Sequence, residues 1–299
     1  MQPFDVVIVG GGPAGLAAAL PLGRARRRAL LCDAGPPRNA RAHEIHNFVT
    51  RDGTPPADFR RIAREQLAPY ASVEVRDARV LRIDGERDDF RIELPDGVVA
   101  ARRVVLAVGM IDELPALPGY RELWGHAIFQ CPYCHAWELR DRPFGVLATV
   151  PGLMEFALIL LNWTRDIVVF TGGAFEVAPD LRARLTAVGV AIDERPIAAL
   201  AARDDDANAL AAVVMADGAR VAREVLFAKP PQRQTELVFA MGLDLDEQRF
   251  VRVSPQGETS RPGVYAAGDL TTPMQSAITA ASAGMVAAAM LNHALSVAE

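Results

Sequence analysis

Apolar residues at the start of the chain form a strand, turn and helix pattern. The β-branched run of residues 4–9 predicts a buried strand. A glycine-rich turn over residues 10–15 follows it, and the leucine- and alanine-rich run of residues 16–20 favours a helix. A second apolar run over residues 29–32 then ends at the acid Asp33. This order is typical of the first half of a nucleotide-binding domain.

The turn Gly10-Gly11-Gly12-Pro13-Ala14-Gly15 has the spacing that dinucleotides require. Gly10 allows the tight turn, Gly12 allows a diphosphate to approach the backbone, and Gly15 allows the helix to pack closely on the strand. Asp33 lies where an acid can accept a ribose hydroxyl. We therefore predict dinucleotide binding; the alternative is a glycine-rich turn without a ligand.

Further along, the pattern predicts more strands and two long helices. A helix over 57–67 follows the Pro55-Pro56 start signal. Short runs at 73–75, 78–83, 90–94 and 98–100, with a turn at 95–97, predict a small antiparallel β-meander. Residues 104–109 and 263–269 predict buried strands that end in glycine, and an alanine-rich helix is expected from Gln275 to His293.

The polar segment of residues 35–48 is broken by prolines and predicts a loop. Loops after the carboxyl ends of parallel strands line the ligand crevice. Arg38, Asn39 and His46 are therefore candidates for cofactor contact, although each could equally be an ordinary surface residue of the loop.

Composition narrows the class of protein. The chain has 299 residues, 51% of them apolar, and a net charge of −5. Its arginines are scattered, so we expect no nucleic acid or membrane partner. Without a basic leader or an apolar stretch of membrane-spanning length, we expect a cytoplasmic protein.

The cysteines supply the candidate chemistry. Cys131 and Cys134 form a CxxC pair, which can pass two electrons by opening and closing a disulfide. Half a zinc site has the same spacing, but the one other cysteine, Cys32, lies in an apolar run and fits a small core residue, so we expect no metal. His135 follows the pair, and because imidazole in general titrates near neutral pH, this side chain could take a proton from an incoming thiol. The alternative for His135 is a structural histidine bonded to a backbone carbonyl.

The glycine turn, the Ala107-Val108-Gly109 strand end, the CxxC pair and the stretch Gly263–Asp269 occur in the order of the thioredoxin reductase family, which the whole chain resembles. The resemblance implies an α/β fold of two Rossmann-like (three-layer ββα) domains. Residues 1–111 and 241–299 would bind FAD, and residues 112–240 would be an inserted NAD(P)-binding-like domain that carries the CxxC. It also implies a homodimer.

The resemblance assigns roles to individual residues. Asp269 would contact the flavin side chain, Cys134 would face the flavin, and Cys131 would exchange with the substrate. His135 is the third expected catalytic residue. The expected cofactor-binding residues are Gly10, Gly12, Pro13, Ala14, Gly15, Asp33, Arg38, Asn39, His46, Val80, Ala107, Gly109, Gly268, Asp269, Gln275 and Ser276.

The insert departs from the family at its nicotinamide site. Residues 148–150 stand where a glycine-rich turn is expected, and Leu153 replaces a small residue. Residues 171–176, which should hold the 2′-phosphate of NADPH, contain no cation, although Arg165, Arg182 and Arg184 are near in sequence. We expect ordinary NADPH use to be lost; the alternative is a divergent turn that still binds it weakly.

The stretch CPYCH, followed by a small residue, an aromatic and Glu138, resembles the dithiol oxidases of disulfide natural products, a branch of the same family. The resemblance implies an FAD-dependent oxidase that closes a disulfide in a small dithiol and passes the electrons to O2. Two alternatives stay open: a thioredoxin or protein-disulfide reductase fed by NADPH or ferredoxin, and a flavin-binding redox sensor without turnover.

Overall fold

The computed structural model describes residues 2–297 and divides into two compact units. The first unit consists of the chain up to Ile111 and from Gln232 onward, and the second unit, the insert, spans Asp112–Pro231. The first boundary lies where the sequence placed it. The second lies at 231/232 rather than 240/241, so residues 232–240 belong to the first unit.

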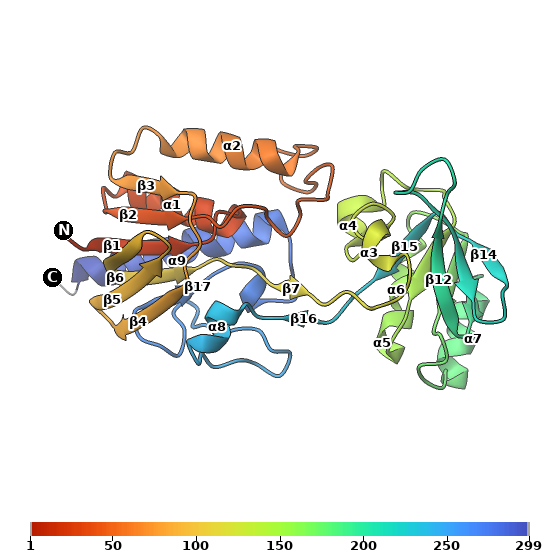
Figure 1. The fold of residues 1–299 in the computed structure, drawn as a ribbon. Coiled ribbons are helices and arrows are strands. Elements are labelled where there is room, and N and C mark those ends of the chain that lie inside the picture. Colours follow the sequence, from red (N-terminus) through yellow and green to blue (C-terminus); the bar gives the residue numbers. More distant parts are fainter. Residues whose placement is uncertain (1, 298–299) are drawn as a thin grey trace. The chain divides into compact units, whose positions relative to one another are not determined.

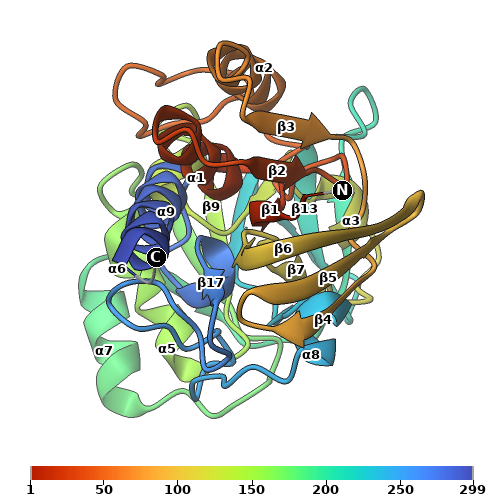
Figure 2. The same cartoon turned by 90° about the vertical axis from the view of Figure 1, so that its left-hand side faces the viewer.

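The first unit is built on a seven-stranded sheet (Figures 1 and 2). Its parallel part has the order β3 (Val73–Arg76), β2 (Ala29–Cys32), β1 (Phe4–Val9), β6 (Gly97–Leu106) and β17 (Val264–Ala266). Two antiparallel strands, β4 (Arg82–Glu86) and β5 (Asp89–Leu94), extend the sheet from β6. The parallel strands end at one edge, where ligands bind in this class of fold.

The predicted antiparallel meander was wrong in two respects. β3 pairs in parallel with β2 and therefore belongs to the nucleotide-binding part of the sheet. The runs 98–100 and 104–106 are one strand, β6, which pairs antiparallel with β5 and parallel with β1. A short run of apolar residues does not reveal its partners, and the two arginines at 102–103 made one strand read as two.

Three helices accompany this sheet: α1 (Pro13–Arg24), α2 (Pro56–Leu67) and α9 (Ala277–Val297). Red α1 and blue α9 come from opposite ends of the chain and lie side by side (Figures 1 and 2). Their contact is close because Gly284 has no side chain: a Cβ there would lie 2.0 Å from the Ala14 carbonyl oxygen. α9 is long and apolar enough to cross a membrane. However, its buried face packs into the core of the first unit, which accounts for its composition.

Residues 232–240 join the first unit through side-chain contacts. The chain passes from one unit to the other through the paired strands β7 (Ile111–Asp112) and β16 (Gln232–Arg233). Next to them, the buried amide of Gln234 donates to the carbonyl oxygens of Arg249 (2.9 Å) and Leu270 (3.0 Å). Val238 on α8 (Glu236–Ala240) enters the same apolar core.

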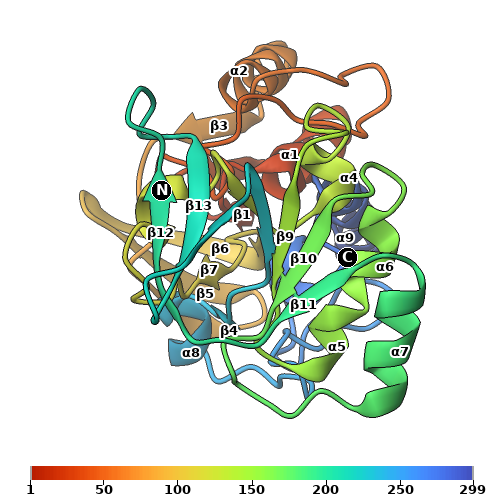
Figure 3. The same cartoon turned by 90° about the vertical axis from the view of Figure 1, so that its right-hand side faces the viewer.

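The insert has its own sheets and its own cores (Figure 3). A five-stranded parallel sheet has the order β11 (Ala191–Asp193), β10 (Ile167–Phe170), β9 (Phe144–Leu147), β15 (Val225–Ala228) and β8 (Ile128–Phe129). A second, antiparallel sheet consists of β12 (Ile197–Ala202), β13 (Leu210–Met215) and β14 (Arg220–Ala222). The helices are α3 (Tyr120–Leu123), α4 (Pro132–His135), α5 (Pro151–Met154), α6 (Phe156–Leu160) and α7 (Pro179–Ala187).

Candidate active site

The glycine turn of the first unit lies between β1 and α1 and leaves its backbone open. Gly10 has a φ of +116°, and a Cβ there would lie 2.2 Å from the Ala107 carbonyl oxygen. A Cβ on Gly15 would lie 1.8 Å from the Gly10 carbonyl oxygen, so both positions require glycine. Nothing lies within 4 Å of the corresponding point on Gly12, the N-cap residue directly before α1. The amino end of a 12-residue helix therefore faces open space, which suits a diphosphate.

Asp33 lies at the end of β2 and is only 4% exposed. Its Oδ1 accepts from the Gly35 backbone N–H (3.1 Å), and its Oδ2 accepts from Arg60 and from Arg64 (2.6 Å), both on α2. Burial raises the pKa of Asp33, but the Gly35 N–H and the two guanidinium groups together outweigh it and lower the pKa below its ordinary value. An ionised carboxylate is therefore fixed beside the glycine turn.

A polar network joins three of the predicted FAD residues. Arg38 donates from Nη1 to Asp269 Oδ2 (3.0 Å) and to Gln275 Oε1 (2.7 Å). Gln275 also exchanges two hydrogen bonds with Gln232 on β16, at 2.8 and 3.1 Å. Gly268 has a φ of +93° and directly precedes η1 (Asp269–Thr271) as its N-cap residue. The loop after β2 and the segment after β17 thus meet, although more than 200 residues separate them.

The remaining predicted residues lie in the first unit with other contacts. His46 lies between Glu44 (3.4 Å) and Asp52 (3.5 Å) in the loop after β2. Asn39 forms a turn there by accepting from the Ala42 N–H. The Val80 side chain is buried in the core, and Ser276 accepts from the Thr279 N–H at the start of α9. Their roles as cofactor ligands stay predictions.

The redox pair lies in the insert, between β8 and β9. Cys131 and Cys134 are joined by a disulfide, with 5.3 Å between their Cα atoms, and both are half-buried. Pro132 begins the four-residue helix α4 and is buried, which fixes the local backbone. The third cysteine, Cys32, is buried in the first unit, where burial raises the pKa of its thiol to about 11 and keeps it protonated. Among residues 2–297 no cluster of His, Cys, Asp and Glu is suited to a metal ion.

Aromatic side chains surround the redox pair. The His135 ring stacks on Phe129, with 4.2 Å between the ring centroids. Tyr133 and Trp137 are 65% and 63% exposed. Tyr133 packs edge-on against Trp163, and the guanidinium of Arg140 lies 4.4 Å from the centre of the Trp137 ring system. Tyr133 and Trp137, which neighbour the cysteines in the chain, therefore present exposed aromatic side chains.

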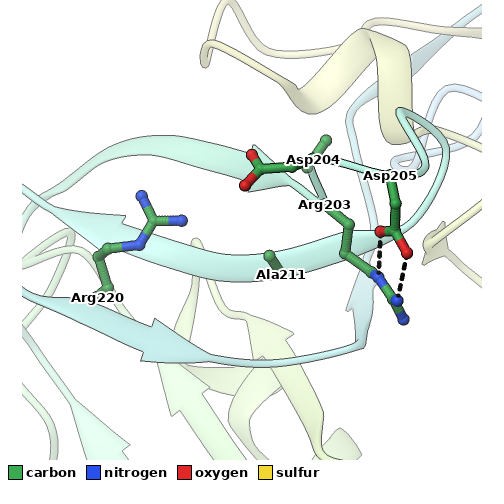
Figure 4. A pocket seen from close by; sticks show the side chains of 6 residues that line it. Arg203, Asp204, Asp205, Ala211 and Arg220 are labelled. Atoms are coloured by element: carbon green, nitrogen blue, oxygen red, sulfur yellow. Dashed lines mark hydrogen bonds and ion pairs between the residues drawn. The ribbon is translucent and has the colours of Figure 1, made fainter.

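The residues that follow β9 and β10 in the insert lie at the positions where the sequence predicts a lost nicotinamide site, and that loss stays a prediction. Ala148 is buried directly after β9, and Val150 precedes α5 as an N-cap residue that makes no side-chain hydrogen bond. Arg182 and Arg184 pair with Glu194 (2.6 Å) and Glu155 (2.7 Å). A shallow depression elsewhere in the insert is lined by Arg203, Asp204, Asp205, Ala211 and Arg220 (Figure 4). There, Arg203 is already paired with Asp205, and no redox or nucleophilic group is present among the lining residues.

Comparison with known proteins decides the family. The model of the pyridine nucleotide-disulphide oxidoreductases matches residues 4–284. The chain belongs to this family. The crystal structure of an oxidoreductase from Agrobacterium tumefaciens is 36% identical and covers 100% of both chains, with a TM-score of 0.93. The crystal structure of HlmI is 37% identical and covers 99% of this chain and 93% of its own, with a TM-score of 0.91.

Characterised relatives point the same way. Thioredoxin reductase aclD of Aspergillus oryzae is 33% identical over 95% of this chain and 94% of its own. Thioredoxin reductase sirT of Leptosphaeria maculans is 31% identical over 97% of this chain and 93% of its own. The prediction of a thioredoxin reductase-like flavin-dependent disulfide oxidoreductase is confirmed, and this family implies FAD.

The geometry of the first unit fits that cofactor. Gly10, Gly12 and Gly15 leave room for the diphosphate, and Asp33 can accept from the ribose. Sequence reasoning missed Arg60, Arg64 and Gln232, which contact the predicted residues. Arg60 and Arg64 are four residues apart on the predicted helix, a spacing that places them on one face, but their target at the end of β2 cannot be read from the spacing.

Proposed function

We propose that the protein is an FAD-dependent oxidase that closes a disulfide in a small dithiol, with O2 as the electron acceptor. The observation that carries the direction of electron flow is the nucleotide-binding edge of the insert. Its turn carries side chains at 148–150, and its nearby arginines, Arg182 and Arg184, are paired with carboxylates. These features support the proposal that the insert has lost its nicotinamide site, and thiols would then be the electron source.

The exchange begins at the Cys131–Cys134 disulfide. A substrate thiolate attacks the Cys131 sulfur, the S–S bond breaks, and Cys134 leaves as a thiolate. The second substrate thiol then attacks the substrate sulfur of the mixed disulfide, which releases a cyclic disulfide and the Cys131 thiolate. His135 takes the proton from the attacking thiol.

The cycle closes with two electrons and two protons. Bound FAD would supply the two-electron redox chemistry that reoxidises Cys131 and Cys134 at the expense of O2, so that dithiol and O2 together yield cyclic disulfide and H2O2. Gly10, Gly12, Gly15 and Asp33 would hold the cofactor, with the network of Arg38, Asp269 and Gln275 at its other end. The partners of this function are a small dithiol, O2 and a second copy of the chain, in the cytoplasm.

The names of the curated relatives favour a rival, a reductase of thioredoxin or a similar protein. An anaerobic titration of the bound flavin with NADPH, NADH and dithiothreitol separates the two. The oxidase predicts bleaching by dithiothreitol and none by either nicotinamide, followed on admission of air by O2 consumption and H2O2 formation. Rapid bleaching by NADPH would overturn the proposal.

Replacing Cys134 with serine supplies the control. The Cys134→Ser protein should stay yellow and lose dithiol-driven O2 consumption, because the variant cannot reform the disulfide. Retained turnover would exclude the disulfide route, and a failure of dithiothreitol to drive turnover in the wild type would favour the redox sensor.

A further inference from the structure

The carboxylate of Asp33 accepts several hydrogen bonds from the protein itself, in addition to the one that it would accept from a ribose hydroxyl. Two guanidinium groups bind the same oxygen, Oδ2, from one turn of α2. Arg60 also donates from Nε to the Gly11 carbonyl oxygen (3.3 Å), so it bridges Asp33 and the glycine turn. Arg64 also donates to Asp77 (2.6 Å), the residue after β3.

The carboxylate lies directly against the backbone of the glycine turn. A Cβ on Gly11 would lie 2.2 Å from Asp33 Oδ2, so glycine is required for this approach. A carboxylate offers about four acceptor positions. Gly35, Arg60 and Arg64 use three of them, which leaves Asp33 able to accept from a further donor.

The contacts of Arg60 and Arg64 differ from those of the other residues of α2. Within this helix only Pro56 and Leu67 are buried, so apolar packing holds it weakly to the sheet. Arg61, the residue after Arg60, is exposed and pairs along its own helix with Asp58 (3.3 Å) and Glu65 (2.9 Å). Only Arg60 and Arg64 of these three arginines reach the cofactor side.

We propose that Arg60 and Arg64 are positioning residues for FAD, which hold the Asp33 carboxylate beside the glycine turn so that it can accept a hydroxyl of the adenosine ribose. The inference rests on the FAD binding contained in the proposed function, but not on the dithiol, O2 or the cysteines. It assigns the affinity for the adenosine half of the cofactor to a helix outside the glycine turn.

The test uses the full-length protein with its flavin removed and measures Kd for FAD and for FMN by flavin fluorescence. FMN lacks the adenosine ribose, so it does not need Asp33. We expect Arg60→Gln and Arg64→Gln each to weaken FAD binding roughly tenfold and to leave FMN binding unchanged, because a hydrogen bond to a charged group is lost. The matched control Arg61→Gln should leave both affinities at the wild-type value.

Wild-type FAD affinity in both glutamine variants would overturn the proposal, and so would an equal loss of FAD and FMN affinity, which would indicate a purely structural role. If the glutamine variants do not fold, Arg60→Lys and Arg64→Lys decide, because lysine keeps the charge but not the forked donor geometry. A lowered ratio of FAD to FMN affinity is then expected, and an unchanged ratio contradicts the inference. No turnover is measured, so a failure of the oxidase assay leaves this result unaffected.

Discussion

Asp33 keeps a negative charge in a nearly dry position because three donors surround it. Its pKa is lowered from an ordinary value of 3.8, so the folded state binds its proton less tightly than the unfolded state does. The stabilisation is therefore present above pH 3.8 and is lost as the pH falls below it. Asp33→Asn should lower the unfolding free energy by about 3 kcal/mol at pH 7, because the two half-buried guanidinium groups of Arg60 and Arg64 lose the buried carboxylate that they share.

The unfolding free energy of the Asp33→Asn variant should also decrease less than that of the wild type as the pH is lowered from neutral. Urea unfolding between pH 3 and pH 7 should show a smaller decrease for Asp33→Asn than for the wild type. Asp58→Asn, at an exposed acid that pairs with Arg61, is the control and should follow the wild-type curve. Parallel curves for Asp33→Asn and the wild type would show that Asp33 contributes nothing to this decrease.

His135 makes a kinetic prediction at the redox pair. His135→Gln should lower dithiol-driven turnover at neutral pH by about a hundredfold, because a positioned base contributes at least that much. Activity should then recover as the pH rises toward about 8.5, where the substrate thiol ionises without help. The measurement is O2 consumption against pH, with His293→Gln, at an exposed position on α9, as the control. An unchanged pH profile in His135→Gln would remove the histidine from the mechanism.

At the scale of elements, the contact of α1 with α9 depends on one missing side chain. Gly284→Ala would place a methyl group 2.0 Å from the Ala14 carbonyl oxygen, which belongs to backbone and cannot move aside. Overpacking of this kind costs about 3 kcal/mol, whereas alanine in place of glycine gains about 1 kcal/mol in a helix. We expect a net loss of about 2 kcal/mol in urea unfolding, accompanied by loss of flavin, because Ala14 lies in the glycine turn.

Gly152→Ala is the matched substitution. Gly152 lies in α5 with nothing within 4 Å of its would-be Cβ, so the alanine should be tolerated or slightly stabilising. If Gly284→Ala were as stable as Gly152→Ala, the two helices would not be held by this close approach.

Elements that carry a local signal could be predicted from the sequence. The glycine turn, α2 after its two prolines and α9 with its alanine run lie within a few residues of their expected bounds. Pairing could not be predicted in the same way. β3 is half-exposed and short, and its partner β2 is separated from it by α2 and a long loop. The contacts that define strand order are non-local, and no residue of β3 encodes them by itself.

The residues of the candidate site also fall into two groups, those that a local sequence motif reveals and those that only the fold brings together. The cysteines, His135 and the glycine turn were visible because their chemistry depends on adjacent residues. The arginines on Asp33 and the pairing of Gln275 with Gln232 were not, because each joins segments at least 27 residues apart. Residues predicted to touch the cofactor lie in sequence motifs, whereas the residues that we propose position them are brought together only by the fold.

At the scale of the whole molecule, the two units have separate apolar cores. Every member of the insert's cores lies between Leu114 and Ala228. Residues 112–231 expressed alone should therefore fold cooperatively, with a Cys131–Cys134 disulfide that dithiothreitol reduces, and should neither bind flavin nor consume O2. Thermal unfolding by circular dichroism and thiol titration check this. A molten insert would mean that it needs the first unit for stability.

The first unit has the opposite character, since its cores combine residues from both ends of the chain. On the ribosome, β1, α1 and β2 emerge early, but their partners β17 and α9 emerge last. Domains fold as units once their residues are available. The insert can therefore fold during synthesis, while the N-terminal segments wait with apolar surface uncovered. FAD would then bind only after translation is complete. A nascent chain that stalls before residue 264 would carry the redox pair in a folded insert but would lack a complete site for the flavin.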